Sequence, residues 1–225
     1  MPWSITTFQD PVTPTIMALT RFHNTCLITL ALITTYVGVS PLKHLFSPYY
    51  FISFNENHEI ELTWTVLPSL ILIMLAIPSL RLLYLIEETV FPHLTVKIIA
   101  HQWYWSYDYI TKKLLEFDSF ILPTNQLTQG DLRLLEVDNR IVIPWGVETR
   151  LLLSSADVLH AWAMPSRGVK ADAIPGRLNQ ITIIPLKPGV FYGQCSEICG
   201  ANHSFMPISI EILPHPLWIK WASAI

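Results

Sequence analysis

Two stretches without any charged residue occupy much of the first third of the chain and limit how it can fold. Residues 24–42 and 62–80 are each 19 residues long and contain no Asp, Glu, Lys or Arg. At about 1.5 Å per residue, a helix of that length approaches the ~30 Å hydrocarbon core of a bilayer. Few helices of soluble proteins are apolar on all sides over such a length. The runs therefore predict two membrane-spanning helices, over about residues 22–45 and 61–87, rather than buried core helices.

A short connection between the two runs predicts a helical hairpin with both chain ends on one side of the membrane. Pro68 and Pro78 lie inside the second run, and transmembrane helices tolerate proline where neighbours satisfy the freed backbone groups. Lys43 is the only Lys or Arg in the connection, a weak positive-inside signal that favours this loop as the inner side. We therefore define residues 1–91 as an irregular, proline-punctuated surface arm followed by the hairpin.

The pattern changes after Pro92, where apolar and polar residues begin to alternate. A period of two is typical of half-buried strands. Turn residues such as Gly130, Pro175-Gly176 and Pro188-Gly189 separate the alternating segments. This pattern predicts a soluble antiparallel all-β sandwich or barrel over residues 92–225, closed by a short helix over 215–222. The predicted strands are Leu94–Ala100, Trp103–Tyr109, Leu132–Val137, Val147–Leu153, Gln180–Ile184 and Pro207–Ile212.

Composition agrees with a chain that is partly in a membrane. Hydrophobic residues make up 51% of the chain and charged residues 14%. A net charge of −3 excludes the basic footprint of a nucleic-acid-binding protein. Three cysteines do not make a disulfide framework. The first twenty residues contain no Lys or Arg, so we expect neither a cleavable secretory signal nor an Arg-rich presequence.

Four metal-ligating side chains fall within twelve positions near the end of the chain: Cys195, Cys199, His203 and Met206. Thiolate and thioether are soft donors that select Cu(I), Zn or iron–sulfur centres. Zinc sites use Cys, His and carboxylate, whereas copper electron-transfer sites combine His and Cys with a weak axial Met. A mononuclear copper site needs one Cys, so two thiolates suggest a bridged copper pair that needs a second imidazole. His160, between strand-like runs of the same domain, is the candidate.

Two other interpretations of this loop stay open from the residues alone. A C-x₃-C pair outside the cytosol could form a disulfide. The two Cys and His203 could instead belong to a Cys₂His₂ zinc site, although the loop has no second close His. Either would make the protein a membrane-tethered binding module, colourless and unable to take up an electron. Both leave Met206 and His160 unexplained. Asn202-His203-Ser204 matches a glycosylation sequon, which we interpret as coincidence because a sugar would obstruct the ligand His203.

The loop Cys195–Pro207 resembles the dinuclear CuA loop of cytochrome c oxidase subunit II. Further resemblance to that family follows in the same order along the chain, in Trp64–Pro68, His101–Tyr107, Leu135–Arg140 and Asp172–Gln180. The resemblance covers nearly the whole chain and is loosest in the first sixty residues. It implies that the β domain is a cupredoxin-like Greek-key barrel.

The resemblance also implies a ligand set for two copper ions, bridged by the two thiolates so that they share one electron. It implies a Mg²⁺ ion on the Glu197 carboxylate, shared with the catalytic subunit. The implied copper ligands are His160, Cys195, the backbone carbonyl of Glu197, Cys199, His203 and Met206.

Other residues take roles only through the resemblance. Trp103 would be the electron-entry residue facing cytochrome c, although aromatic residues there also suit core packing or an interfacial belt. Acids would attract the basic haem protein, but Lys112-Lys113 stands where relatives tend to have acids. Glu61 would mark the mouth of a proton-uptake path or simply anchor the helix. The implied docking residues are Tyr104, Asp108, Asp138 and Asp157.

The sequence thus predicts a subunit of cytochrome c oxidase, part of an oxidoreductase and proton translocase. It would accept electrons from cytochrome c and pass them to a haem–copper subunit that reduces oxygen to water with proton pumping. Its expected location is the mitochondrial inner membrane, with both termini and the copper domain in the intermembrane space. A copper-free quinol-oxidase-type subunit is a further alternative, disfavoured because every ligand position is filled.

Overall fold

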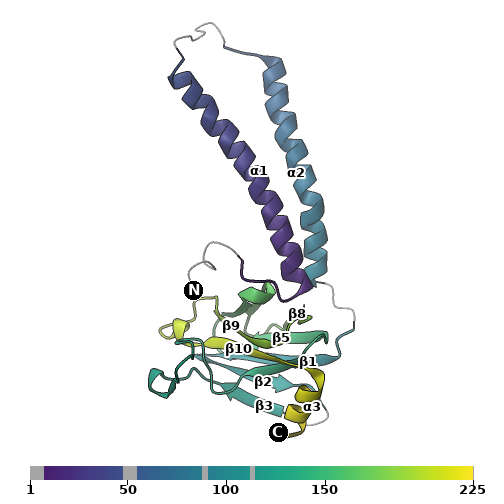
Figure 1. Cartoon of the computed structure of the whole chain (residues 1–225), viewed down its shortest axis with the longest axis vertical. Coiled ribbons are helices and arrows are strands. Elements are labelled where there is room, and N and C mark those ends of the chain that lie inside the picture. The colour runs from purple at the N-terminus through teal and green to yellow at the C-terminus, as the bar shows by residue number, and fades with distance from the viewer. Residues whose placement is uncertain (1–7, 48–54, 88–90, 112–114, 225) are drawn as a thin grey trace. The chain divides into compact units, whose positions relative to one another are not determined.

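The structure is a computed structural model, and it describes residues 8–47, 55–87, 91–111 and 115–224. Two apolar helices precede a β-sandwich domain, as predicted (Figure 1). The chain divides into two compact units: a helical unit, residues 18–85, and a β unit, which joins residues up to 17 with those from 86 onward. The expected division between residues 91 and 92 therefore does not coincide with this one, because the start of the first helix packs with the β unit.

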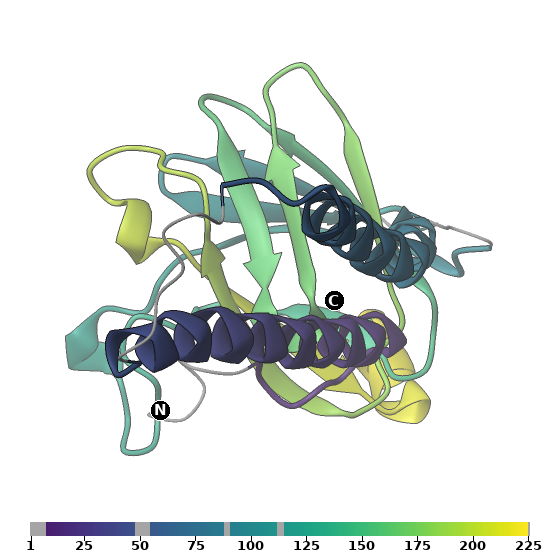
Figure 2. The ribbon, with the colours of Figure 1, turned by 90° about the horizontal axis from the view of Figure 1, so that it is seen from above.

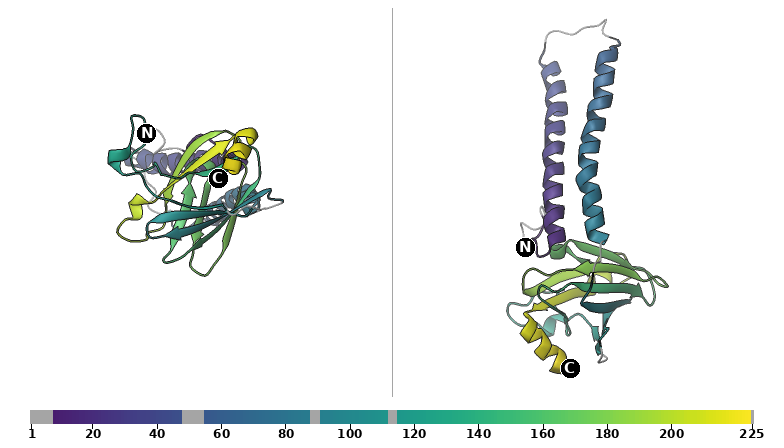
Figure 3. Two further views of the ribbon diagram at one scale, coloured as in Figure 1. Left: turned by 90° about the horizontal axis from the view of Figure 1, so that it is seen from below. Right: turned by 90° about the vertical axis from the view of Figure 1, so that its right-hand side faces the viewer.

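The helical unit is formed by the antiparallel helices α1 (Pro14–Leu45) and α2 (His58–Glu87) (Figures 1 and 3). Both are long and apolar enough to cross a membrane. Asn57 caps α2, its side-chain oxygen accepting from the N–H groups of Glu59 and Ile60 at 3.1 Å each. The Ser69 hydroxyl, beside Pro68, donates to the carbonyl of Thr65 at 2.8 Å, so this polar group is satisfied inside the apolar helix.

Val12 and Thr13, the last residues before α1, are buried in the β unit, whereas residues 8–10 are exposed, as expected for a surface arm. The N–H of Val12 donates to the carbonyl of Ser166 at 3.3 Å, and its carbonyl accepts from Leu186 at 2.8 Å. The Thr13 hydroxyl donates to the carbonyl of Arg167 at 2.8 Å. These three hydrogen bonds hold Val12 and Thr13 against the β unit. The prolines and polar residues of this segment do not predict such a contact.

Within the described ranges, ten strands form two five-stranded sheets, ordered β3-β2-β1-β5-β8 and β4-β10-β9-β6-β7. Most ladders are antiparallel, but β1–β5 and β4–β10 are parallel, so the expectation of a purely antiparallel domain is wrong at two ladders. The strands are β1 (Leu94–His101), β2 (Tyr104–Tyr109), β3 (Leu115–Ser119), β4 (Ile141–Pro144), β5 (Thr149–Ser155), β6 (His160–Met164), β7 (Val169–Ala173), β8 (Asn179–Ile183), β9 (Gly189–Cys195) and β10 (Pro207–Leu213).

The predicted strand Leu132–Val137 is wrong over most of its length. This segment turns instead: the N–H groups of Leu135 and Glu136 both donate to the carbonyl of Leu132, and Leu134 has a positive φ of 69°. Alternation alone could not separate a turn from a strand. The closing helix is confirmed as α3 (His215–Ala224), which ends the chain beside the sandwich (Figure 3).

The core lies between the two sheets and is rich in aromatic side chains. Trp105, Tyr107 and Trp162 are fully buried in it. The Tyr109 hydroxyl donates to the carbonyl of Val142 and accepts from its N–H, which links the two sheets. Burial raises the pKa of Tyr109 far above its usual range. This packed core supports the loops at the end of the second sheet.

Candidate metal centre

The candidate ligands meet where three strands of the second sheet begin or end. His160 opens β6, Cys195 closes β9, and the two strands pair with Trp162 opposite Cys195. A loop then leads through the short helix η4 (His203–Phe205) to the start of β10 (Figure 2). Gly193 permits this pairing, because a Cβ there would collide with the backbone oxygen of Ala163.

The sulfur and nitrogen atoms of the loop converge on a small volume. The Cys195 and Cys199 sulfurs lie 4.0 Å apart. Cys195 Sγ is 3.8 Å from His160 Nδ1, and Cys199 Sγ is 3.4 Å from His203 Nδ1 and 3.5 Å from Met206 Sδ. The donor atoms of His160, Cys195 and Cys199 all lie within 4.8 Å of one another, a cluster that could hold a metal ion.

The backbone adds one further donor. The carbonyl oxygen of Glu197 lies 3.3 Å from Cys195 Sγ. The donors therefore sort into two groups: His160 and the Glu197 carbonyl stand by Cys195, whereas His203 and Met206 stand by Cys199. Thiolate, imidazole and thioether together form the soft donor set that fits copper.

The ring of His160 is oriented by a carboxylate. His160 is fully buried, and its Nε2 lies 2.9 Å from Asp157 Oδ1. A carboxylate only accepts hydrogen bonds, so Nε2 carries the proton and Nδ1 presents its lone pair towards Cys195. Partial burial opposes ionisation of Asp157, yet hydrogen bonds from His160, Val158 and Gln102 lower its pKa. This arrangement fixes the tautomer that a metal ligand needs.

Two side chains from the β1–β2 connection hold the carbonyl of Cys199. The Gln102 amide donates to this oxygen at 2.8 Å and the Trp103 indole at 3.3 Å. The next residue, Gly200, has a φ of 121°, and a Cβ there would lie 3.2 Å from both side chains. The glycine therefore lets an aromatic side chain lie directly against the ligand loop.

The two cysteines are free thiols in a poorly hydrated place. Burial, together with the neighbouring Cys195, raises the pKa of Cys199 to about 12. Such a thiol does not ionise at neutral pH by itself, but metal binding deprotonates it. The chemistry of this loop is thus metal binding rather than nucleophilic attack.

Several predicted site residues lie together and others do not. The six implied copper donors and Trp103 converge, as described. Glu61 lies in the first turn of α2, 3.6 Å from His58 Nδ1, in the other unit. Asp138 accepts hydrogen bonds from the N–H groups of Phe120 and Asn139, away from the ligand loop. Lys112-Lys113 lies outside the described residues.

Tyr104 and Asp108 both lie on β2 of the first sheet. Tyr104 stacks between His101 and Phe120, with ring centroids 4.5 Å from each. Asp108 is half-buried on β2. The supporting role of Gln102 and the orienting role of Asp157 are absent from the sequence-based site. The available sequence signals were the position of Gln102 next to Trp103 and that of Asp157 three residues before His160.

Comparisons with known proteins agree with this architecture. A family model for the periplasmic domain of cytochrome c oxidase subunit II matches residues 94–213, and one for its transmembrane domain matches residues 1–82. The chain is similar to the crystal structure of the periplasmic domain of subunit II of cytochrome oxidase from Bradyrhizobium japonicum. That match has 44% identity and a TM-score of 0.57, covering 61% of this chain and 96% of the other.

A second similar structure is the mixed disulfide intermediate between a thioredoxin-like protein and subunit II of cytochrome c oxidase. Identity there is 43% and the TM-score 0.54, with 61% of this chain and 94% of the other covered.

Proposed function

The chain belongs to the cytochrome c oxidase subunit II family, and from this premise we propose that it accepts electrons from cytochrome c at a dinuclear CuA centre. It passes them to a haem–copper catalytic subunit that reduces oxygen and pumps protons. The observation that carries the proposal is the convergence of two thiols, two imidazoles and a thioether, with sulfur–nitrogen and sulfur–sulfur distances of 3.4–4.0 Å.

The donor groups indicate which residues would hold the two ions. Cys195 and Cys199 would hold them together with His160 and the Glu197 carbonyl, which stand by Cys195, and with His203 and Met206, which stand by Cys199. When bound, the copper pair supplies a one-electron couple. Met206 is only 1% exposed and its sulfur is 3.5 Å from Cys199 Sγ, which favours copper over zinc, since thioether is not a usual zinc donor.

The protein's own contribution is to keep the donors in place while the charge changes. Asp157 holds the ring of His160, and the Trp105 indole donates to the carbonyl of Met206 at 3.3 Å. Donors held on strand ends by such bonds have little freedom to rearrange, which favours fast electron transfer.

Trp103 is the proposed point of electron entry. Its indole is hydrogen-bonded to the carbonyl of the ligand Cys199 and is only partly buried, so one side chain links the surface to the centre. We place cytochrome c over this face, with Tyr104, Asp108, Asp138 and Asp157 as docking residues. The Asp157 carboxylate serves His160 as well, which makes it the docking acid most closely coupled to the site.

Three further parts of the proposal concern the assembled complex. The Glu197 carboxylate would bind Mg²⁺ together with the catalytic subunit. Glu61 would lie at the entrance of a proton path. The location would be the mitochondrial inner membrane, with the metal domain and both termini in the intermembrane space. Protease accessibility of the β domain in intact mitochondria and in mitoplasts tests this orientation.

Copper reconstitution of the full chain in detergent tests the central proposal. Optical and EPR spectra recorded during titration should show a purple protein with one electron shared over two coppers. The H160A, C195S, C199S, H203A and M206L variants should each alter those spectra. A folded, colourless protein that holds zinc or a Cys195–Cys199 disulfide would instead establish a structural module.

A further inference from the structure

A groove between the two helices of the helical unit carries two arginines that the proposed function does not use. It has a volume of about 370 Å³ and is formed by the first part of α1 and the last part of α2. Arg21 and Arg81 line it from opposite helices. The other walls are mostly apolar and include Phe22, Leu82 and Leu85. Its size lies within the ~300–1,000 Å³ typical of ligand sites.

Neither guanidinium has a protein partner. In the part of the chain that the structure describes, Arg21 and Arg81 make no ion pair, and their side chains make no hydrogen bond. Both residues are exposed. A guanidinium offers five N–H donors in a planar fork that matches phosphate and carboxylate oxygens. Two such groups at one groove therefore form an anion-binding pair to which the described residues supply no anion.

The arginines also stand at one level of the hairpin. Arg21 lies just before the charge-free run 24–42, and Arg81 directly follows the charge-free run 62–80. Because α1 and α2 are antiparallel, both residues fall at the same end of the apolar span. This is the depth at which phospholipid phosphates lie, with acyl chains extending along the apolar helix surfaces beyond.

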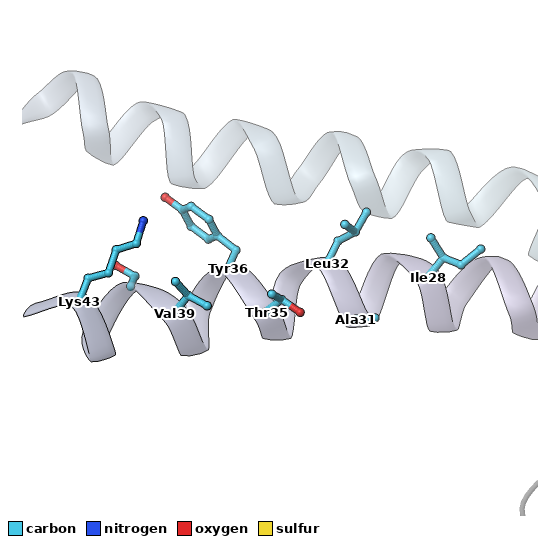
Figure 4. Close-up of a pocket in the computed structure, with 8 residues that line it drawn as sticks. Ile28, Ala31, Leu32, Thr35, Tyr36, Val39 and Lys43 are labelled. Carbon is cyan, nitrogen blue, oxygen red and sulfur yellow. The ribbon is translucent and has the colours of Figure 1, made fainter.

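The groove at the other end of the hairpin is lined by one cation instead of two. It has a volume of about 600 Å³ and is lined by α1 residues from Ile28 to Lys43 (Figure 4). Lys43 is its one charged lining residue. An ammonium is a point charge without the planar fork of arginine. Lys43 therefore supplies a matched control, because it is a single cation beside an apolar groove on the same hairpin.

We propose that the groove between α1 and α2 binds one anionic phospholipid. Its phosphate is held between Arg21 and Arg81, and an acyl chain packs on Phe22, Leu82 and Leu85. A lipid is favoured over a carboxylate of another subunit because the charged end of the groove continues into apolar walls. A carboxylate side chain would leave these walls uncovered. If Arg21 and Arg81 instead reached the membrane interface independently of each other, they would select no particular lipid.

Native mass spectrometry of the full chain in detergent micelles tests this proposal. The probe is dioleoyl-phosphatidylglycerol, compared with dioleoyl-phosphatidylcholine and with soluble glycerol 3-phosphate. We expect the wild type to retain one phosphatidylglycerol more tightly than phosphatidylcholine, with no displacement by glycerol 3-phosphate. R21Q and R81Q should each weaken binding about tenfold, since each removes charge-assisted hydrogen bonds to one phosphate. K43Q should leave it unchanged.

Folding of each variant is checked by helicity and by thermal unfolding of the β unit. R21K and R81K keep the charge but lose the fork, and an intermediate loss of about threefold is expected. If the double variant R21Q/R81Q binds phosphatidylglycerol as tightly as K43Q does, the proposal is overturned. Equal affinity for both lipids would overturn it too, as would displacement by glycerol 3-phosphate, which would indicate a site for a soluble anion. A cross-link from this groove to a carboxylate of another subunit in the complex would also overturn it. None of these outcomes depends on the copper proposal.

Discussion

Replacing Asp157 with alanine should lower both the stability of the β unit and its affinity for copper. The carboxylate accepts hydrogen bonds from His160 Nε2 at 2.9 Å and from the N–H groups of Gln102 and Val158 at 2.6 Å each. Hydrogen bonds to charged groups contribute about 1.5–3 kcal/mol each. The side chain is 30% exposed, so water replaces part of this, and we expect a loss of about 2–4 kcal/mol in total.

The effect on metal binding should be a second, separately measurable loss. Without the carboxylate, His160 is free to rotate or to change tautomer, and loss of such a partner weakens metal binding about 10–100-fold. D157N, which keeps the shape and one acceptor oxygen, should fall between the wild type and D157A. Thermal unfolding of the apo form measures the first quantity, and competition for copper measures the second.

Asp138 offers the matched control. Its carboxylate also accepts two backbone hydrogen bonds, from Phe120 and Asn139 at 2.7 Å each, but it does not contact the ligand loop. D138A should lower stability by about 1–2 kcal/mol and leave copper affinity unchanged. If D157A and D138A bind copper equally well, Asp157 does not orient the ligand and the reasoning is refuted.

Three further predictions follow from individual contacts. G193A should destabilise the β unit by about 3 kcal/mol or more, because the added Cβ would collide with the backbone oxygen of Ala163 and only separation of β6 from β9 could relieve the clash. A change under about 1 kcal/mol in calorimetry would contradict this. W103F removes the indole donor to Cys199 and should slow reduction by cytochrome c at least tenfold while the copper EPR signal stays as in the wild type; unchanged stopped-flow rates would count against Trp103 as the entry point. Because the pKa of Cys199 is raised to about 12, copper loading must displace its proton, and apparent affinity should still rise about tenfold per pH unit above about pH 9, where a thiol with an ordinary pKa of about 8.5 is mostly ionised. A profile that levels off at about pH 9 in competition titrations would contradict the raised pKa.

Much of the architecture could be predicted from local pattern. The two charge-free runs correspond to α1 and α2, although α1 begins at Pro14 rather than near residue 22. Its first turn is anchored instead by Thr13 and Ile16, both buried in the β unit. Alternation located β1, β2, β5, β8 and β10 but missed the seven-residue β9 that ends at Cys195. It also misplaced one strand at Leu132–Val137, since a turn with the same alternation has no distinguishing local signal.

The sequence by itself determined the chemistry of the metal loop, because Cys195, Cys199, His203 and Met206 are close along the chain. Side chains so close along the chain can meet within one loop, without pairing between distant segments. Only the tertiary structure decided how His160 reaches Cys195 and how Asp157 and Gln102 support them. These contacts depend on β6 pairing with β9 and on the β1–β2 connection lying over the loop. Residues distant in sequence meet only through the sheet register, which depends on the packing of the whole core and not on any single segment.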